Sequence, residues 1–98
     1  MAVAQLIAHA AGSRKEARAR VWLRTGNGRI TVNEKDLDAY FPTPALREAV
    51  RQPLVATNTQ GRFDVVAHAE GGGVRGQAEA VRHALSRALL GMDDALRG

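Results

Sequence analysis

Apolar and polar residues alternate without a break over residues 17–24. One side of this segment carries Ala17, Ala19, Val21 and Leu23, and the other side carries Arg18, Arg20, Trp22 and Arg24. Alternation with a period of two predicts a half-buried strand, here with a cationic outer face. The glycines and asparagine of residues 25–28 tolerate positive φ, and residues 29–33 resume extended character. The pattern therefore predicts a β-hairpin.

The middle of the chain predicts two short helices and then a second hairpin. A proline stops or opens a helix according to its position, so Pro42 should end the first helix and Pro44 should begin the second. Alternation then returns, because Phe63, Val65 and Ala67 fall on one face of an extended segment. The predicted elements are a helix at 36–41, a helix from 44 to about 50, a strand at 52–57, a turn at 58–61 and a strand at 63–69.

The last predicted element is an amphipathic helix that follows a glycine-rich corner. Gly71-Gly72-Gly73 leads into a helix from Gly76 to about Leu90, where apolar residues recur at helical spacing, and Gly91 should end it. The element order is β-β-α-α-β-β-α. We predict an α+β fold with one sheet covered by helices on one face, leaving the other face or an edge open. The predicted division is a flexible N-terminal extension at 1–11, a globular domain at 12–91 and a C-terminal end at 92–98.

Length and composition narrow the class of protein. The chain has 98 residues, enough for one domain, and it contains no cysteine, which excludes disulfides and thiolate chemistry. A reducing compartment is expected, so we predict a cytoplasmic protein. The apolar start, residues 1–11, is interrupted by Gln5 and His9 and predicts neither a signal peptide nor a membrane span. The three histidines lack metal-ligand spacing, and no serine lies in a catalytic motif. We expect no enzymatic activity, no metal and no cofactor.

The positive charge is concentrated near the start of the chain. Net charge is +4, but the first thirty residues contain six basic residues and one acidic residue, whereas the rest is nearly balanced. A basic segment on a near-neutral body is typical of a surface that faces an anion, and nucleic acid is the commonest large polyanion. A solvated strand explains the charge equally well. Charge alone leaves both interpretations open.

Two segments carry candidate binding chemistry. The first is the corner Gly71-Gly72-Gly73-Val74-Arg75-Gly76-Gln77. Its glycines let a ligand approach the backbone, the helix N-terminus directs N–H groups at it, Arg75 can bind a phosphate with two N–H groups, and Gln77 adds an amide. These features favour an anion site over a plain linker. The corner matches neither a P-loop nor a dinucleotide fingerprint. The second segment joins Gly12-Ser13-Arg14-Lys15 to the outer strand face of Arg18, Arg20, Trp22 and Arg24. RNA contact is the favoured interpretation for Arg14 and Lys15, and structural packing is favoured for Trp22.

Four blocks of sequence, in order, resemble the small-subunit ribosomal protein nine family. They are residues 12–21 (GSRKEARARV), 26–33 (GNGRITVN), 61–65 (GRFDV) and 71–89, which opens with GGGVRGQ and continues to RHALSRAL. The resemblance implies a fold like the second domain of ribosomal protein five, with a left-handed βαβ crossover. It also implies binding to the 3′ major domain of small-subunit ribosomal RNA, in the head, beside other head proteins. The resemblance implies RNA contact for Gly12, Ser13, Arg14, Lys15, Gly71, Gly72, Gly73, Arg75, Gly76 and Gln77. We predict RNA contact for Arg18, Arg20, Arg82 and His83 as well.

The sequence departs from that family's pattern in three places. The usual Gly-Thr-Gly-Arg-Arg-Lys start has lost one basic residue in Ala10-Ala11-Gly12-Ser13-Arg14-Lys15, and the family's usual alanine-valine pair is Ala17-Arg18 here. The long basic C-terminal tail of the family is also missing, so we expect no contact with transfer RNA. Two other functions stay open. They are a non-ribosomal interaction module that uses the hairpin edge, and a nucleotide-binding module on the same fold.

Overall fold

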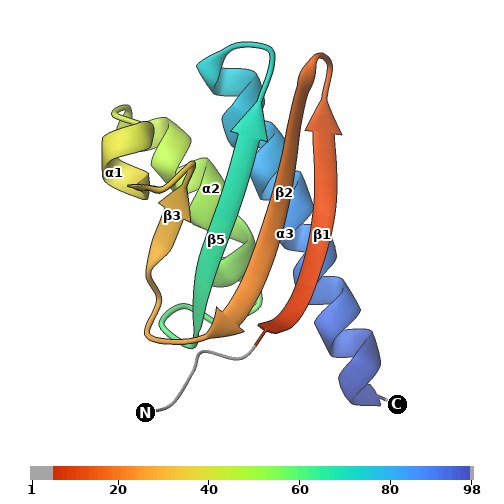
Figure 1. Cartoon of the computed structure of the whole chain (residues 1–98). Coiled ribbons are helices and arrows are strands. Elements are labelled where there is room, and N and C mark those ends of the chain that lie inside the picture. Colours follow the sequence, from red (N-terminus) through yellow and green to blue (C-terminus); the bar gives the residue numbers. More distant parts are fainter. Residues whose placement is uncertain (1–5, 98) are drawn as a thin grey trace.

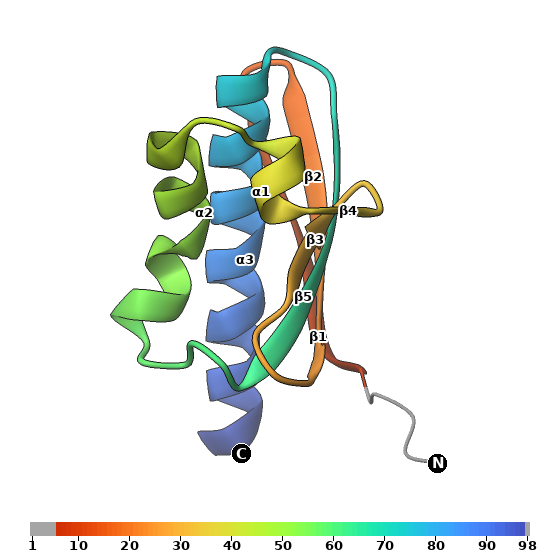
Figure 2. The same ribbon diagram turned by 90° about the vertical axis from the view of Figure 1, so that its left-hand side faces the viewer.

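The structure, a computed structural model, describes residues 6–97, with side chains described as far as residue 92. A single five-stranded sheet is packed against helices on one of its faces (Figures 1 and 2). The elements are β1 (Leu6–Arg14), β2 (Ala17–Thr25), β3 (Ile30–Val32), β4 (Lys35–Asp36), α1 (Leu37–Tyr40), α2 (Pro44–Ala56), β5 (Phe63–Glu70) and α3 (Val74–Arg97). The α+β class is confirmed.

The sheet has the order β1-β2-β5-β3-β4, with β3 parallel to β5 and the other neighbours antiparallel. The core lies between this sheet and the two longer helices. Val21 and Leu23 of β2 are fully buried there with Leu85 of α3. The apolar side of the 17–24 alternation therefore faces the helices, and its arginine side faces outward, as the sequence predicts. The handedness of the β3-to-β5 crossover stays a prediction.

The prediction that residues 17–33 form a hairpin is wrong, because β5 lies between β2 and β3. The cause is a long-range contact at the loop that follows β2. The Asp64 side chain, on β5, accepts hydrogen bonds at Oδ1 from the backbone N–H groups of Asn27, Gly28 and Arg29 at 3.0, 3.2 and 3.0 Å. This carboxylate holds the loop open across the end of β5, so the chain passes over that strand instead of turning back beside β2.

The predicted strand at 52–57 and its hairpin with 63–69 are also wrong. Helix α2 continues from Pro44 through Pro53 to Ala56, because Val50 and Leu54 extend one buried stripe at helical spacing. An interior proline removes a hydrogen bond and costs about 3 kcal/mol. Pro53 is itself buried, so its ring contributes apolar contact that offsets part of this cost. The helix starting at Pro44, the short helix before it and strand 63–69 are confirmed.

The chain's two ends differ from the prediction in opposite ways. Residues 6–11, expected within a flexible extension, belong to β1, an edge strand of the sheet, whereas residues 1–5 lie outside the described residues. Ala8 and Ala10 pack against the core, and Gly12 is buried. These small residues let β1 lie close to α3. Gly91 does not end the last helix, which begins at Val74 and runs to Arg97.

Candidate nucleic-acid interface

The glycine corner between β5 and α3 packs directly against the turn between β1 and β2. Gly71 and Gly72 have φ values of +74° and +58°, which residues other than glycine rarely adopt. A Cβ on Gly71 would lie 2.5 Å from the carbonyl oxygen of Glu16, and a Cβ on Gly72 would lie 3.1 Å from the Cβ of Ala17. These two glycines are therefore required by backbone conformation and by close packing of the corner.

Two further glycines of the predicted site also serve packing. A Cβ on Gly12 would lie 2.6 Å from the backbone nitrogen of Ala84 and 2.8 Å from the carbonyl oxygen of Ala80, both in α3. A Cβ on Gly76 would lie 3.3 Å from that of Ala17. Gly73 differs, because nothing lies within 4 Å of the same position. Among the glycines predicted to bind, Gly73 is the one that the fold leaves open.

The side chain of Gln77 is part of a hydrogen-bond network beneath the corner. Its Nε2 donates to the carbonyl oxygen of Gly71 at 3.2 Å, and its Oε1 accepts from the hydroxyl of Tyr40. Asn33 Nδ2 donates to that hydroxyl at 3.0 Å and to the carbonyl oxygen of Ala69 at 2.9 Å. These hydrogen bonds fix the Gln77 amide beneath the corner, and they leave one N–H and one oxygen lone pair of the amide unused by the described residues.

Cations surround the outside of the corner. A groove there is lined by Arg14, Lys15, Glu16, Gly72, Gly73, Arg75, Gly76 and Glu79. Arg14 Nε forms an ion pair of 2.9 Å with Glu79 Oε2, which fixes the end of β1 to α3. Lys15, at the tip of the turn with φ of +55°, and Arg75, in the first turn of α3, are exposed. Within the described part of the chain neither of these two has an ion-pair partner.

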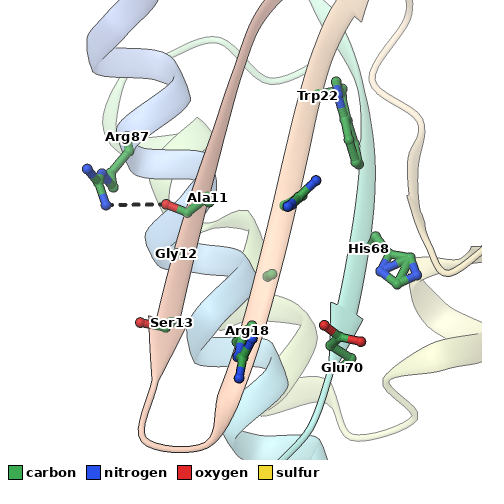
Figure 3. A pocket seen from close by; sticks show the side chains of 10 residues that line it. Ala11, Gly12, Ser13, Arg18, Trp22, His68, Glu70 and Arg87 are labelled. Atoms are coloured by element: carbon green, nitrogen blue, oxygen red, sulfur yellow. Dashed lines mark hydrogen bonds between the residues drawn. The ribbon is translucent and has the colours of Figure 1, made fainter.

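The second cationic area is the face of the sheet that the helices leave uncovered. Arg18 and Arg20 project from β2 on this face, next to the corner because the turn at Lys15 precedes β2. In the strand register, Arg18 lies opposite Ser13 and Glu70, and Arg20 lies opposite Ala11 and His68. In Figure 3, Trp22 and Arg18 lie on β2 at opposite ends of the view, and His68 and Glu70 lie on the neighbouring strand β5. These residues, with Ser13, line one shallow pocket.

Arg82 and His83 lie further along α3 and are exposed. Arg82 follows Arg75 by seven residues, so the two share one face of the helix about 10 Å apart along its axis. His83 follows Glu79 by four residues, on the side of α3 that meets β1. On that side Arg87 donates to the carbonyl oxygen of Ala11 at 3.4 Å (Figure 3). Sequence reasoning missed Arg87, which also lines the shallow pocket with Arg18. Its spacing from Glu79 and His83 was the available signal.

The remaining features bear on the alternatives. None of the described residues is a buried polar or charged side chain, so this part of the chain contains no desolvated acid–base pair. Over the same residues, no group of three or more histidine, aspartate or glutamate side chains could hold a metal ion. The helices described here include none that is long and apolar enough to cross a membrane. What the surface does present is exposed arginine and lysine.

One family matches nearly the whole chain. Its description is ribosomal protein S9/S16, and the match covers residues 12–98. The matched range contains the β1–β2 turn, the open sheet face of β2 and β5, the glycine corner and α3. The resemblance inferred from the four sequence blocks is thereby confirmed. The chain belongs to the ribosomal protein S9/S16 family, whose members are structural proteins of the small ribosomal subunit.

Proposed function

We propose that this protein is a structural constituent of the small ribosomal subunit that binds ribosomal RNA in the head and thereby supports translation. Its RNA-binding surface consists of the groove at the glycine corner and the open sheet face beside it. The residues proposed to contact RNA are Ser13, Arg14, Lys15, Arg18, Arg20, Gly73, Arg75, Arg82 and His83. Gly12, Gly71, Gly72, Gly76 and Gln77 shape this surface from below. Their close contacts and hydrogen bonds support that division.

The distribution of ion pairs is the observation that carries the proposal. Arg29 pairs with Asp36, Arg47 with Asp38, and Arg51 with Asp38 and Glu48, all away from the corner, while at the corner Arg14 pairs with Glu79. On the proposed surface, by contrast, Lys15, Arg18, Arg20 and Arg75 have no carboxylate within 4.0 Å among the described residues. Charges left unpaired by the protein are available to neutralise phosphates, which supplies most of the sequence-independent affinity for RNA.

Salt dependence gives this proposal a magnitude. Each neutralised phosphate contributes about 0.7 to 0.9 to the slope of log affinity against log salt. Four to six contacts therefore predict a loss of about 100- to 1,000-fold between 50 and 200 mM salt. The measurement is binding of the protein to a head-domain ribosomal RNA fragment across that range. Affinity that does not change with salt, or no binding at 50 mM salt, would contradict the proposal.

A pair of lysine variants locates the surface. Lys15→Gln removes a charge at the turn beside the corner, and Lys35→Gln removes the same charge from β4, at the opposite edge of the sheet. Both lysines are exposed, so neither substitution disturbs the core. Lys15→Gln should lower the magnitude of the salt slope by about 0.7 to 0.9. Lys35→Gln should leave it unchanged, and equal effects of the two variants would place the RNA elsewhere.

A nucleotide-binding function has less support. Glycines in a phosphate loop are needed so that the backbone can approach the ligand. Here the conformations and neighbours of Gly71 and Gly72 account for both residues without a ligand. Of the two carboxylates that line the groove, Glu79 is paired with Arg14. Calorimetry with nucleoside triphosphates in the absence of RNA separates the two functions, and micromolar binding there would favour the enzyme-like alternative.

A further inference from the structure

Trp22 occupies an unusual place for the chain's single tryptophan. It lies on the outer face of β2, while its neighbours Val21 and Leu23 point to the opposite face and are fully buried. Trp22 is of intermediate exposure, and Figure 2 shows no helix on its side of the sheet. A large aromatic ring placed there contributes little to the core between sheet and helices. Any packing role of Trp22, which the sequence favours, therefore lies on the outer face of the sheet and stays a prediction.

The surroundings of Trp22 combine apolar and cationic side chains. Along β2, Arg20 and Arg24 lie two residues before and after it, about 7 Å away on the same face. Across the sheet, Trp22 is opposite His9 of β1 and Val66 of β5, whose side chain is 36% exposed. This surface therefore presents an aromatic ring and an apolar side chain next to arginines on the same face of the sheet.

The charges on this face favour an anion. No described carboxylate forms an ion pair with Arg20 or Arg24. The nearest carboxylate in register with Arg24 is Asp64, which instead accepts the backbone N–H groups of residues 27–29. Glu70 lies opposite Arg18 without an ion pair, so it weakens the positive potential mainly at that end. Arg20 and Arg24, which have no ion pair among the described residues, therefore flank Trp22 on this face.

We propose that this face binds a single-stranded segment of RNA, with one unpaired base stacked on Trp22 and adjacent phosphates at Arg20 and Arg24. A ring that stacks on a base needs the base to be unpaired, whereas phosphate contacts alone do not distinguish single strands from duplexes. The inference rests on the proposed function, since it names which part of the RNA this face takes. It differs from the corner, whose groove contains no aromatic residue.

The test uses the intrinsic fluorescence of Trp22, which reports on this face alone because the chain has no other tryptophan. Three probes of similar charge are titrated at low salt: an unstructured adenosine-rich RNA ten nucleotides long, a short RNA duplex, and inorganic polyphosphate. Stacking should quench the fluorescence with the single strand and leave it nearly unchanged with the duplex and polyphosphate. Equal quenching by all three probes would overturn the inference.

Two variants separate stacking from charge, with binding followed by the anisotropy of labelled RNA. Trp22→Leu keeps an apolar side chain and should weaken single-strand binding at least about fivefold while leaving polyphosphate binding and the salt slope unchanged. Arg20→Gln should reduce the salt slope but keep the full quenching at saturation. Circular dichroism checks that both variants remain folded.

The failures of the inference and of the proposed function are distinguishable. If Trp22→Leu binds the single strand as tightly as the unmodified protein, stacking is absent but the proposed function stands. If poly-glutamate quenches Trp22 as strongly as the single strand, the face suits an acidic protein partner and the inference is overturned. If neither the ribosomal RNA fragment nor the ten-nucleotide strand binds at low salt, both proposals fail.

Discussion

Replacing Gly12 by alanine tests whether this glycine lies in the binding motif for packing or for RNA. In the structure Gly12 of β1 packs against the backbone of α3. An added Cβ would lie 2.6 Å from the Ala84 nitrogen and 2.8 Å from the Ala80 carbonyl oxygen. Both atoms belong to helix backbone, which cannot rotate away as a side chain could. Strand and helix must therefore separate, since ordinary contact begins at 3.4 Å.

The expected cost follows from this overlap. The strand must move by about 0.8 Å, from 2.6 Å to 3.4 Å, along an interface that also includes Ala8 and Ala10. Forcing extra volume into a packed interface typically costs about 1–3 kcal/mol. For a domain of this size, that loss should lower the thermal midpoint by roughly 4–20 °C. The Arg14–Glu79 ion pair at the end of the same strand should weaken as well.

A second glycine-to-alanine change provides the matched control. Gly91 lies in α3 with its Cβ position free of contacts, so Gly91→Ala should stabilise the helix by about 0.5–1 kcal/mol. Thermal and urea unfolding, followed by circular dichroism, compare the two variants with the unmodified protein. A Gly12→Ala midpoint equal to or above that of the unmodified protein would refute the packing role and return Gly12 to the RNA surface.

Three further predictions concern the contacts that fix the glycine corner and the loop after β2. Asn33→Ala removes two hydrogen bonds to Ala69 and substitutes a residue with φ of +51°, so urea unfolding should show a loss of about 2–4 kcal/mol. Asp64→Ala removes the acceptor for three backbone N–H groups and should cost about 1–3 kcal/mol, whereas Asp64→Asn keeps an oxygen acceptor and should cost less. Equal costs for the two Asp64 variants would contradict this reasoning. Gly71→Ala should lower the thermal midpoint because of its φ of +74° and the nearby Glu16 carbonyl, while Gly73→Ala should change the midpoint little. A larger loss for Gly73→Ala than for Gly71→Ala would contradict the packing described.

The spacing of apolar residues and prolines along the sequence predicted β2 and the start of α2 correctly. The alternation from Ala17 to Arg24 reports which side of β2 meets the core, and Pro44 marks the start of α2, as found. Tertiary contacts decided the rest. The turn residues after β2 resemble a hairpin loop, and nothing nearby in sequence indicates that Asp64 binds their N–H groups. Proline is normally excluded from helix interiors, but at Pro53 the continuing buried apolar stripe of α2 outweighed this preference.

The candidate site shows the same division. The sequence predicts exposed cations beside the glycine corner, and Lys15 and Arg75 are exposed there, while their contact with RNA stays a prediction. The packing contacts of Gly12 and Gln77 could not be predicted, because a glycine against α3 and a glycine against RNA look identical in sequence. Only the 2.6 Å approach to Ala84 and the hydrogen bonds to Tyr40 and Gly71 distinguish packing from binding. The alternation placed Trp22 on the outer face of its strand, as found, but no local pattern distinguishes packing from RNA contact for an aromatic residue on that face.

Association with the small ribosomal subunit tests the central claim most directly. An affinity-tagged form of the chain is expressed in cells, and the lysate is fractionated on sucrose gradients at low and at high salt. The account predicts that the protein sediments with the small subunit at low salt. It also predicts that Lys15→Gln combined with Arg75→Gln dissociates at lower salt than Lys35→Gln. Recovery of the unmodified protein only at the top of the gradient, at low salt, would contradict the account.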